Sequence, residues 1–216
     1  CIGLAVSPTL DDENPGYGWQ DRGPLFCTSP ADLSMNALDS HAFSDRDGRD
    51  WLVYGSFFGG IFLVELDAAT GMASRDGAPL FLARKPEPYF GLPGIWAVEA
   101  AWVDEHNGWY YLFVNWDRCC RGVESDYNIR VGRAHRVTGP YVDRAGVRMD
   151  EGGGTLVAAT TGRYIGPGHA GIFTERGRSL FTFHFYDGEN AGIPTLAIRQ
   201  LRWSEDGWPV VDVGGR

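Results

Sequence analysis

Three stretches of the chain share one pattern, in which a polar residue precedes an apolar run that ends in a glycine-containing turn. The polar residues are Asp39, Glu99 and His169. The first two are 60 residues apart and the last two are 70 residues apart. Self-similarity at such a period is typical of proteins built from one repeated supersecondary unit. We therefore interpret the chain as three copies of one strand pattern.

Each copy continues with three further predicted strands. The second strand is rich in aromatic residues, the third is apolar or alternating, and the fourth is a short outer segment. The second strands are Trp51–Phe57, Trp109–Trp116 and Ser179–Tyr186; the third are Ile61–Leu66, Asn128–His135 and Thr195–Trp203; the fourth are Leu80–Ala83, Tyr141–Arg148 and Trp208–Val211. Four short strands per unit, separated by turns, are typical of the blades of a β-propeller.

The start of the chain matches only the second half of this unit. Ile2–Val6 resembles a third strand, and Trp19–Gly23 resembles an outer segment. Because the chain begins at Cys1 rather than Met, we expect it to be the C-terminal piece of a longer protein. The pattern therefore predicts about three and a half blades of a propeller, forming a single partial domain over residues 1–216.

Composition supports an all-β fold. No window shows sustained apolar residues at helical spacing, and 30 Gly and 12 Pro interrupt any long helix. With 216 residues and 44% hydrophobic content, the chain is long enough to bury one sizeable core. The abundant Trp, Tyr, Phe, Val and Ile favour strands.

Charge and hydropathy limit the possible partners. A net charge of -9 argues against nucleic acid, because phosphate binding needs a basic surface. No apolar run approaches the roughly 18 residues that span a bilayer, so we expect no membrane partner. Neutral sugars are compatible with this charge. Eight Trp and nine Tyr could stack on sugar rings, although packing between blades explains most of them.

The four cysteines leave the redox compartment open. No Cys-x-x-Cys pair exists, which argues against a structural zinc site. Cys119 and Cys120 are adjacent and could be either a disulfide or two thiols. Neither Cys1 nor Cys27 has an obvious partner. The sequence therefore leaves both localisation and oligomeric state open.

Two of the repeated polar residues are carboxylates, and paired carboxylates are the usual machinery of glycoside hydrolysis. The general acid of such a pair must be protonated, which apolar surroundings or a nearby negative charge favour. Glu99 lies in the largely apolar segment Ile95–Trp102 and is the better candidate for the acid. Asp39 would be the base or a negative neighbour of the acid. The structural alternatives are an arginine partner for Glu99 and a turn-capping role for Asp39.

His169 occupies the third position, within the small-residue segment Gly166–Gly171. Small residues let the backbone approach another group closely. We expect His169 either to bind substrate or to hold a metal ion at the axis of the propeller. A purely structural histidine is the alternative.

The residues that match a known family run in order along nearly the whole chain. They are Asn36–Asp39, Tyr54–Ile61, Val98–Ala100, Tyr110–Trp116, Cys119–Gly122, Val131–Arg133, Val137–Tyr141, Gly152–Thr155, Gly166–His169 and Asp206–Pro209. The chain resembles the glycoside hydrolases of family 43, and specifically the endo-1,5-α-L-arabinanases. The adjacent cysteines, the Thr-Gly-Pro-Tyr segment and the Gly-Gly-Gly segment are more specific than any single acid.

The resemblance implies a five-bladed β-propeller that hydrolyses α-1,5-linked L-arabinan with inversion. It implies that Glu99 is the acid, that Asp39 orients the acid, and that His169 lies near a calcium ion held largely through water. It also implies a sugar site lined by Asn36, Ser56 and Phe57, beside the substrate-binding role already inferred for His169. The catalytic base belongs to a first blade upstream of Cys1, so we expect the 216-residue chain alone to be close to inactive.

Three rival interpretations remain open. The first is a non-catalytic, carbohydrate-binding propeller. The second is another activity of the same family, an arabinofuranosidase or a β-xylosidase, with a closed pocket formed by loops such as Arg84–Pro93 and Arg118–Asn128. The third is a propeller that acts on levan or sucrose, a class that lacks the adjacent cysteines and the Thr-Gly-Pro-Tyr segment.

Overall fold

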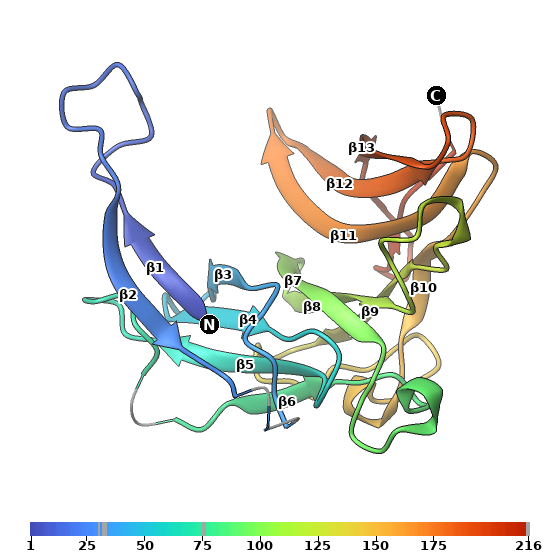
Figure 1. Cartoon of the computed structure of the whole chain (residues 1–216), viewed down its shortest axis with the longest axis horizontal. Helices are drawn as coiled ribbons and strands as arrows, with labels where there is room; N and C mark the ends of the chain where they lie inside the picture. Colours follow the sequence, from blue (N-terminus) through green and yellow to red (C-terminus); the bar gives the residue numbers. More distant parts are fainter. Residues whose placement is uncertain (30, 32–33, 75–76, 215–216) are drawn as a thin grey trace.

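Strands dominate the computed structural model, which describes residues 1–29, 31, 34–74 and 77–214 (Figure 1). The helical elements of these residues are three short 3-10 turns: η1 (Tyr89–Gly91), η2 (Gly122–Glu124) and η3 (Met149–Glu151). The all-β prediction is confirmed. Within the described ranges, no helix has the length and apolar character needed to cross a membrane.

Three antiparallel sheets follow one another along the chain, with a two-stranded sheet before them and another after them (Figure 1). The opening sheet pairs β1 (Ile2–Val6) with β2 (Gln20–Phe26). The next contains β3 (His41–Ser44), β4 (Asp50–Tyr54), β5 (Ile61–Leu66) and β6 (Leu80–Ala83). The middle sheet contains β7 (Val98–His106), β8 (Trp109–Trp116), β9 (Asn128–Ala134) and β10 (Thr155–Ala158). The last sheets contain β11 (Tyr164–Glu175), β12 (Arg178–Asp187) and β13 (Ile193–Gln200), and then β14 (Arg202–Trp203) with β15 (Pro209–Val210).

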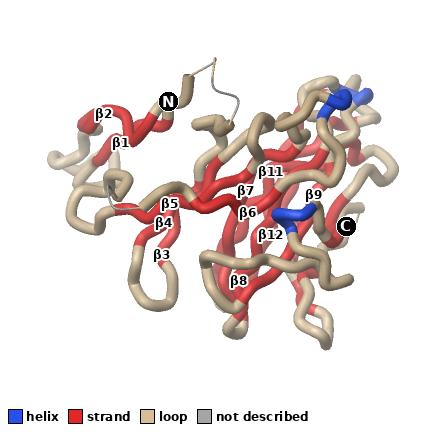
Figure 2. The backbone as a smooth tube through the Cα atoms, turned by 90° about the horizontal axis from the view of Figure 1, so that it is seen from below, coloured by secondary structure: helices blue, strands red, loops and turns tan. Residues whose placement is uncertain are grey.

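The first strands of the three repeats lie near one another. β7 contacts both β3 and β11, and Figure 2 shows β7 and β11 in the centre of the molecule. One buried cluster lies between the β3–β6 sheet and the β7–β10 sheet and includes Val53, Val98 and Leu112. A second lies between the middle sheet and the β11–β13 sheet and includes Phe113 and Phe181. The core is therefore formed between sheets, and the middle sheet buries residues on both of its faces.

The predicted second strands agree with β4, β8 and β12, although β4 ends at Tyr54 instead of Phe57. The prediction of Tyr141–Arg148 as a fourth strand was wrong. Val142 makes only isolated bridges, and the segment from Asp143 to Val147 folds back on itself through a hydrogen bond between their backbone groups. The fourth strand of the middle sheet is β10, which pairs with β9.

The last predicted strands were also partly wrong. Thr195–Trp203 is not one strand, because the chain changes sheet at Leu201 between β13 and β14. Trp208–Val211 contains β15, but β15 pairs with β14 and does not extend the β11–β13 sheet.

Cys1 and Cys27, for which the sequence offered no obvious partner, are bonded to each other. The antiparallel pairing of β1 with β2 places Ile2 opposite Phe26 and so brings the two cysteines together. Their Cα atoms are 4.0 Å apart.

Candidate functional site

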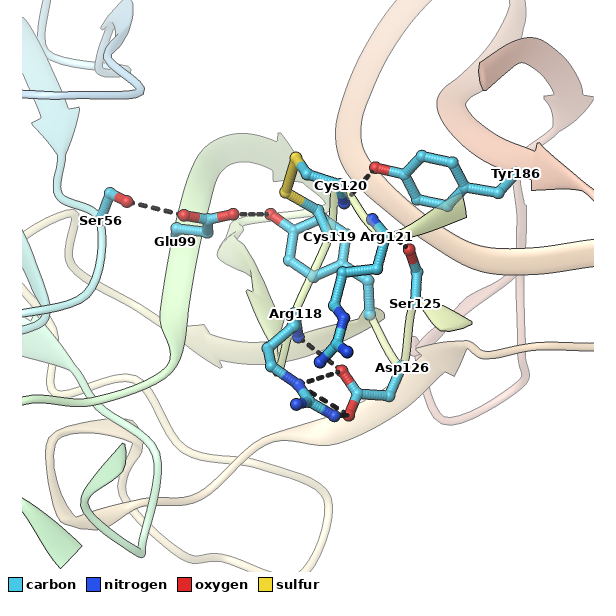
Figure 3. The surroundings of a disulfide bond; sticks show 10 residues. Ser56, Glu99, Arg118, Cys119, Cys120, Arg121, Ser125, Asp126 and Tyr186 are labelled. Carbon is cyan, nitrogen blue, oxygen red and sulfur yellow. Dashed lines mark hydrogen bonds and ion pairs between the residues drawn. A yellow bond between two sulfur atoms is a disulfide. The ribbon is translucent and has the colours of Figure 1, made fainter. Parts of the chain in front are cut away.

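Glu99 is buried at the start of β7, where two hydroxyl groups hold its carboxyl (Figure 3). Ser56 donates a hydrogen bond of 2.6 Å to Oε2, and Tyr127 donates one of 2.8 Å to Oε1. The residue itself is only 9% exposed. A buried carboxyl with both oxygens hydrogen-bonded has a fixed orientation, as a general acid requires.

The segment that supplies Ser56 is fixed by backbone contacts to β7. Ser56 forms an isolated antiparallel bridge with Glu99, and the amide of Phe57 donates to the carbonyl of Val98 at 2.9 Å. The side-chain amide of Asn36 donates to the carbonyl of Ser56 at 2.8 Å. Ser56 therefore holds the carboxyl of Glu99, and Asn36 in turn holds the backbone of Ser56. Of the predicted sugar-lining residues, Asn36 and Phe57 are partly exposed and His169 is exposed.

Asp39 is half-buried and interacts with both other predicted site residues. Burial raises the pKa of its carboxyl, and the charge of Glu99 raises it further. His169 and a hydrogen bond from the backbone of Ala100 act in the opposite direction. The structure thus brings both Glu99 and His169 within electrostatic reach of Asp39, as the repeat pattern predicted.

The repeats coincide in backbone conformation as well as in position. Asp39, Ala100 and His169 have φ angles of 54°, 54° and 57°, in the left-handed region that is unusual for residues other than glycine. In the middle repeat the equivalent residue is therefore Ala100, and Glu99 is offset from it by one. β7 and β11 also change register close to these residues, between Glu99 and Trp102 and between Gly168 and Gly171.

His169 is exposed at the point where β11 approaches β8. Its backbone amide donates to the side-chain oxygen of Asn115 at 3.0 Å. The preceding residue, Gly168, lies against the ring of Tyr127, because a Cβ atom at this position would be 2.0 Å from a ring carbon. Only glycine allows this approach, which confirms the expected role of small residues around His169.

Tyr127 is a component that sequence reasoning missed. It is 2% exposed, and burial, followed by the charge of Glu99, raises the pKa of its phenol well above the usual value. The hydroxyl therefore stays protonated and can donate to Glu99 at any ordinary pH. A tyrosine directly before a predicted strand carried no chemical signal of its own. Its partner lies 28 residues away in the sequence.

Cys119 and Cys120 form a disulfide in the loop that precedes Tyr127, one of the two alternatives left open by the sequence. Figure 3 shows Glu99 on one side of this disulfide and Tyr186 on the other. The amide of Cys120 donates to the hydroxyl of Tyr186 at 2.6 Å. The loop is therefore attached to β12 as well as to the middle sheet.

The described residues contain few side chains near His169 that could bind calcium directly. They contain no group of three or more His, Cys, Asp or Glu side chains that could hold a metal ion. Calcium takes six to eight oxygen ligands, whereas the imidazole and carboxyl side chains of this site are those of His169, Asp39 and Glu99. These donors do not fit an ion bound directly by protein groups.

Comparison with known proteins identifies similar chains. A family model described as "Glycosyl hydrolases family 43" matches residues 2–209. The extracellular endo-alpha-(1->5)-L-arabinanase 1 of Bacillus subtilis (strain 168) is 38% identical over 209 residues, which are 97% of this chain and 59% of the relative. The extracellular exo-alpha-(1->5)-L-arabinofuranosidase of Cellvibrio japonicus (strain Ueda107) is 33% identical over 215 residues, 98% of this chain and 62% of the relative. The chain thus spans about three fifths of the length of these curated relatives.

Solved structures of arabinanases are also similar to this chain. The structure of Cellvibrio cellulosa alpha-L-arabinanase complexed with arabinohexaose matches with a TM-score of 0.90 at 32% identity, covering 97% of this chain and 68% of that one. An exo-1,5-alpha-L-arabinanase from a bovine ruminal metagenomic library matches with a TM-score of 0.89 at 38% identity, with the same coverage of 97% and 68%.

Proposed function

The chain belongs to family 43 of the glycosyl hydrolases, and from this premise we propose that the complete protein hydrolyses α-1,5-linked L-arabinan or its oligosaccharides. By the complete protein we mean the product of the whole reading frame that contains these 216 residues. The names of its relatives support this substrate class. The observation that carries the proposal is the buried carboxyl of Glu99, held by two hydroxyl groups beside Asp39.

In this mechanism Glu99 is the general acid and gives its proton to the glycosidic oxygen that leaves. Ser56 and Tyr127 keep the carboxyl pointed at that oxygen. Asp39 is a positioning residue. Its carboxyl lies within electrostatic reach of Glu99, which together with burial raises the pKa of Asp39 itself. His169 and Phe57, which are both partly or fully exposed, would contact the sugar.

We propose an inverting reaction, in which a separate carboxylate activates water on the opposite face of the sugar. By resemblance to the family, this base lies upstream of Cys1. The partial coverage of the relatives, 62% and 59%, is compatible with a base outside these residues.

The same proposal extends to the architecture. We propose a five-bladed propeller, of which residues 1–216 form about three and a half blades in one partial domain. The contacts of β7 with both β3 and β11 support an arrangement of the repeats around a common axis. A crystal structure of the complete protein would test the number of blades.

The test of the catalytic proposal compares the complete protein with its Glu99→Gln variant on linear 1,5-arabinan. We expect the variant to lose about 10²–10⁴-fold in turnover, the usual contribution of general acid catalysis. Chromatography of released sugars separates endo action, which gives mixed oligosaccharides, from exo action, which gives one short product. Binding of arabinan without turnover by the unmodified complete protein would instead favour the non-catalytic, carbohydrate-binding alternative.

Calcium remains a proposal of its own. An ion near His169 would be held through water, since the side chains present do not form a direct site. Titration calorimetry of the metal-free complete protein with calcium chloride tests this. A saturable heat that His169→Ala abolishes would support the ion, and no heat would exclude it.

A further inference from the structure

A loop over residues 86–95 presents two large apolar side chains to water. Phe90 is 76% exposed and Leu92 is 50% exposed. Phe90 also has a left-handed backbone, with φ 48° and ψ 30°. This conformation is a genuine outlier for a bulky residue. Both the exposure of the ring and the backbone conformation are unfavourable for the free chain.

Contacts between aromatic rings connect this loop to the catalytic candidate. The ring of Phe57 meets the ring of Tyr89 edge to face, with centroids 5.1 Å apart. The ring of Tyr89 lies 4.3 Å from that of Phe90. Phe57 directly follows Ser56, which donates to Glu99. A series of three aromatic rings therefore leads from the neighbour of the acid to the exposed end of the loop.

The backbone supports this series at both ends. The amide of Trp96 donates to the carbonyl of Phe58 at 3.1 Å, and the amide of Tyr89 donates to the carbonyl of Ile95 at 2.6 Å. Tyr89 is also close enough to Arg118, which precedes the Cys119–Cys120 disulfide, to influence its pKa. The loop and the disulfide-bearing loop therefore lie on the same side of the site.

We propose that Phe90 forms an outer sugar subsite, which binds an arabinofuranosyl residue of a chain whose scissile bond lies at Glu99. The inference rests on the proposed function, since it names how the same site recognises a long substrate. An exposed aromatic face next to a binding site is a typical ligand surface. It offers a large apolar contact to the C–H groups of a neutral sugar ring. Leu92 would widen this contact.

The consequence is selectivity for chain length. On this proposal a disaccharide at the acid leaves Phe90 uncontacted, whereas a hexasaccharide extends as far as its ring. The ring of Phe90 should therefore contribute to binding of long oligosaccharides and not of short ones.

The test uses the complete protein carrying Glu99→Gln, so that bound sugars are not cleaved. Its affinity for arabinohexaose and for arabinobiose is measured by titration calorimetry, with and without Phe90→Asn. Asparagine tolerates the left-handed backbone, so this change removes the ring without disturbing the loop. We expect hexaose binding to weaken on the order of tenfold and biose binding to stay unchanged. Phe90→Tyr, which keeps the aromatic face, should restore the affinity for hexaose.

Trp19→Ala is the matched control, because Trp19 is an aromatic residue of the β1–β2 hairpin with 57% exposure. It should leave both affinities unchanged. Equal hexaose affinity with and without the Phe90 ring would overturn the subsite and leave the proposed function standing. Failure of the complete protein to bind either sugar would overturn both. An equal loss for hexaose and biose would show that Phe90 acts at the acid itself, and the outer subsite would again be wrong.

Discussion

Tyr127 and Tyr141 are both buried tyrosines, with 2% and 1% exposure, and each donates one hydrogen bond. The hydroxyl of Tyr127 donates to the carboxyl of Glu99, whereas that of Tyr141 donates to the carbonyl of Val137 at 2.9 Å. Variants that lack either hydroxyl can therefore be compared. Both lose a buried hydrogen bond, but only the variant of Tyr127 loses a contact with the acid.

We predict that Tyr127→Phe lowers the turnover of the complete protein about tenfold, because the hydrogen bond that orients the carboxyl of Glu99 is lost. Tyr141→Phe should lower the melting temperature about as much as Tyr127→Phe does. It should leave turnover close to that of the unmodified protein. Turnover on linear arabinan and melting temperature are measured for both variants. Equal turnover of the two would mean that the Tyr127 hydroxyl does not position Glu99.

Asp104 is a carboxylate on β7 that the proposed mechanism does not use. Burial, and then the charge of Glu105, raises its pKa to about 6. Because the folded state binds this proton more tightly than the unfolded state, folding is not penalised below about pH 4 and loses stability as the pH rises through 6.

We predict that Asp104→Asn stabilises the 216-residue chain by roughly 1–3 kcal/mol at pH 7. The gain should disappear at pH 4, where Asp104 is neutral when folded. Urea unfolding at the two pH values measures the difference. The control is Asp12→Asn at an exposed position, which should stay within about 0.5 kcal/mol at both pH values. A gain independent of pH would contradict the assigned cause.

At the scale of elements, the approach of β11 to the ring of Tyr127 depends on the absence of a side chain at Gly168. We predict that Gly168→Ala destabilises the chain by about 1–3 kcal/mol, as overpacking of a close contact does. It should also lower turnover of the complete protein, because the displaced ring carries the hydroxyl that holds Glu99.

Gly18→Ala is a suitable comparison, since a Cβ there would meet nothing within 4 Å. Thermal unfolding and turnover are compared for the two variants. If Gly168→Ala were as stable and as active as Gly18→Ala, the contact with Tyr127 would not support the site.

Strand prediction succeeded where the pattern and the pairing were both local. β5 and β8 have the predicted bounds, because apolar residues on these strands face the clusters between sheets. Strand prediction failed for Tyr141–Arg148, where the apolar residues are not part of a strand. Tyr141 is buried as a single side chain bonded to Val137, while β10, which has only four residues, takes the edge position. The four-residue edge strand β6, in contrast, has the predicted bounds Leu80–Ala83, because there the apolar segment itself pairs with β5.

The candidate site was predictable only where a local sequence pattern marks its residues. The repeat pattern pointed to Asp39, Glu99 and His169, although the backbone equivalent in the middle repeat is Ala100 and Glu99 precedes it by one residue. Asp39 lies within electrostatic reach of both other residues. The supports were not predictable. Tyr127 reaches Glu99 from a loop, and Ser56 does so from the end of another sheet. Such contacts depend on how sheets pack together, which no local pattern encodes.

At the scale of the whole molecule, the proposed position of the base makes a direct prediction. The purified 216-residue chain should release almost no sugar from linear arabinan, whereas the complete protein should release it readily, because no positioned base would activate water. Circular dichroism of the 216-residue chain controls for folding. Robust turnover by the shorter chain would mean that the base lies within it.

The two disulfides have a practical consequence. They use all four cysteines, so the chain carries no reactive thiol of its own. A cysteine introduced in place of Leu92, an exposed position, would be the single target for a maleimide dye when no reducing agent is present. A fluorophore attached there would report in real time when a polysaccharide reaches the loop, independently of whether any bond is cleaved.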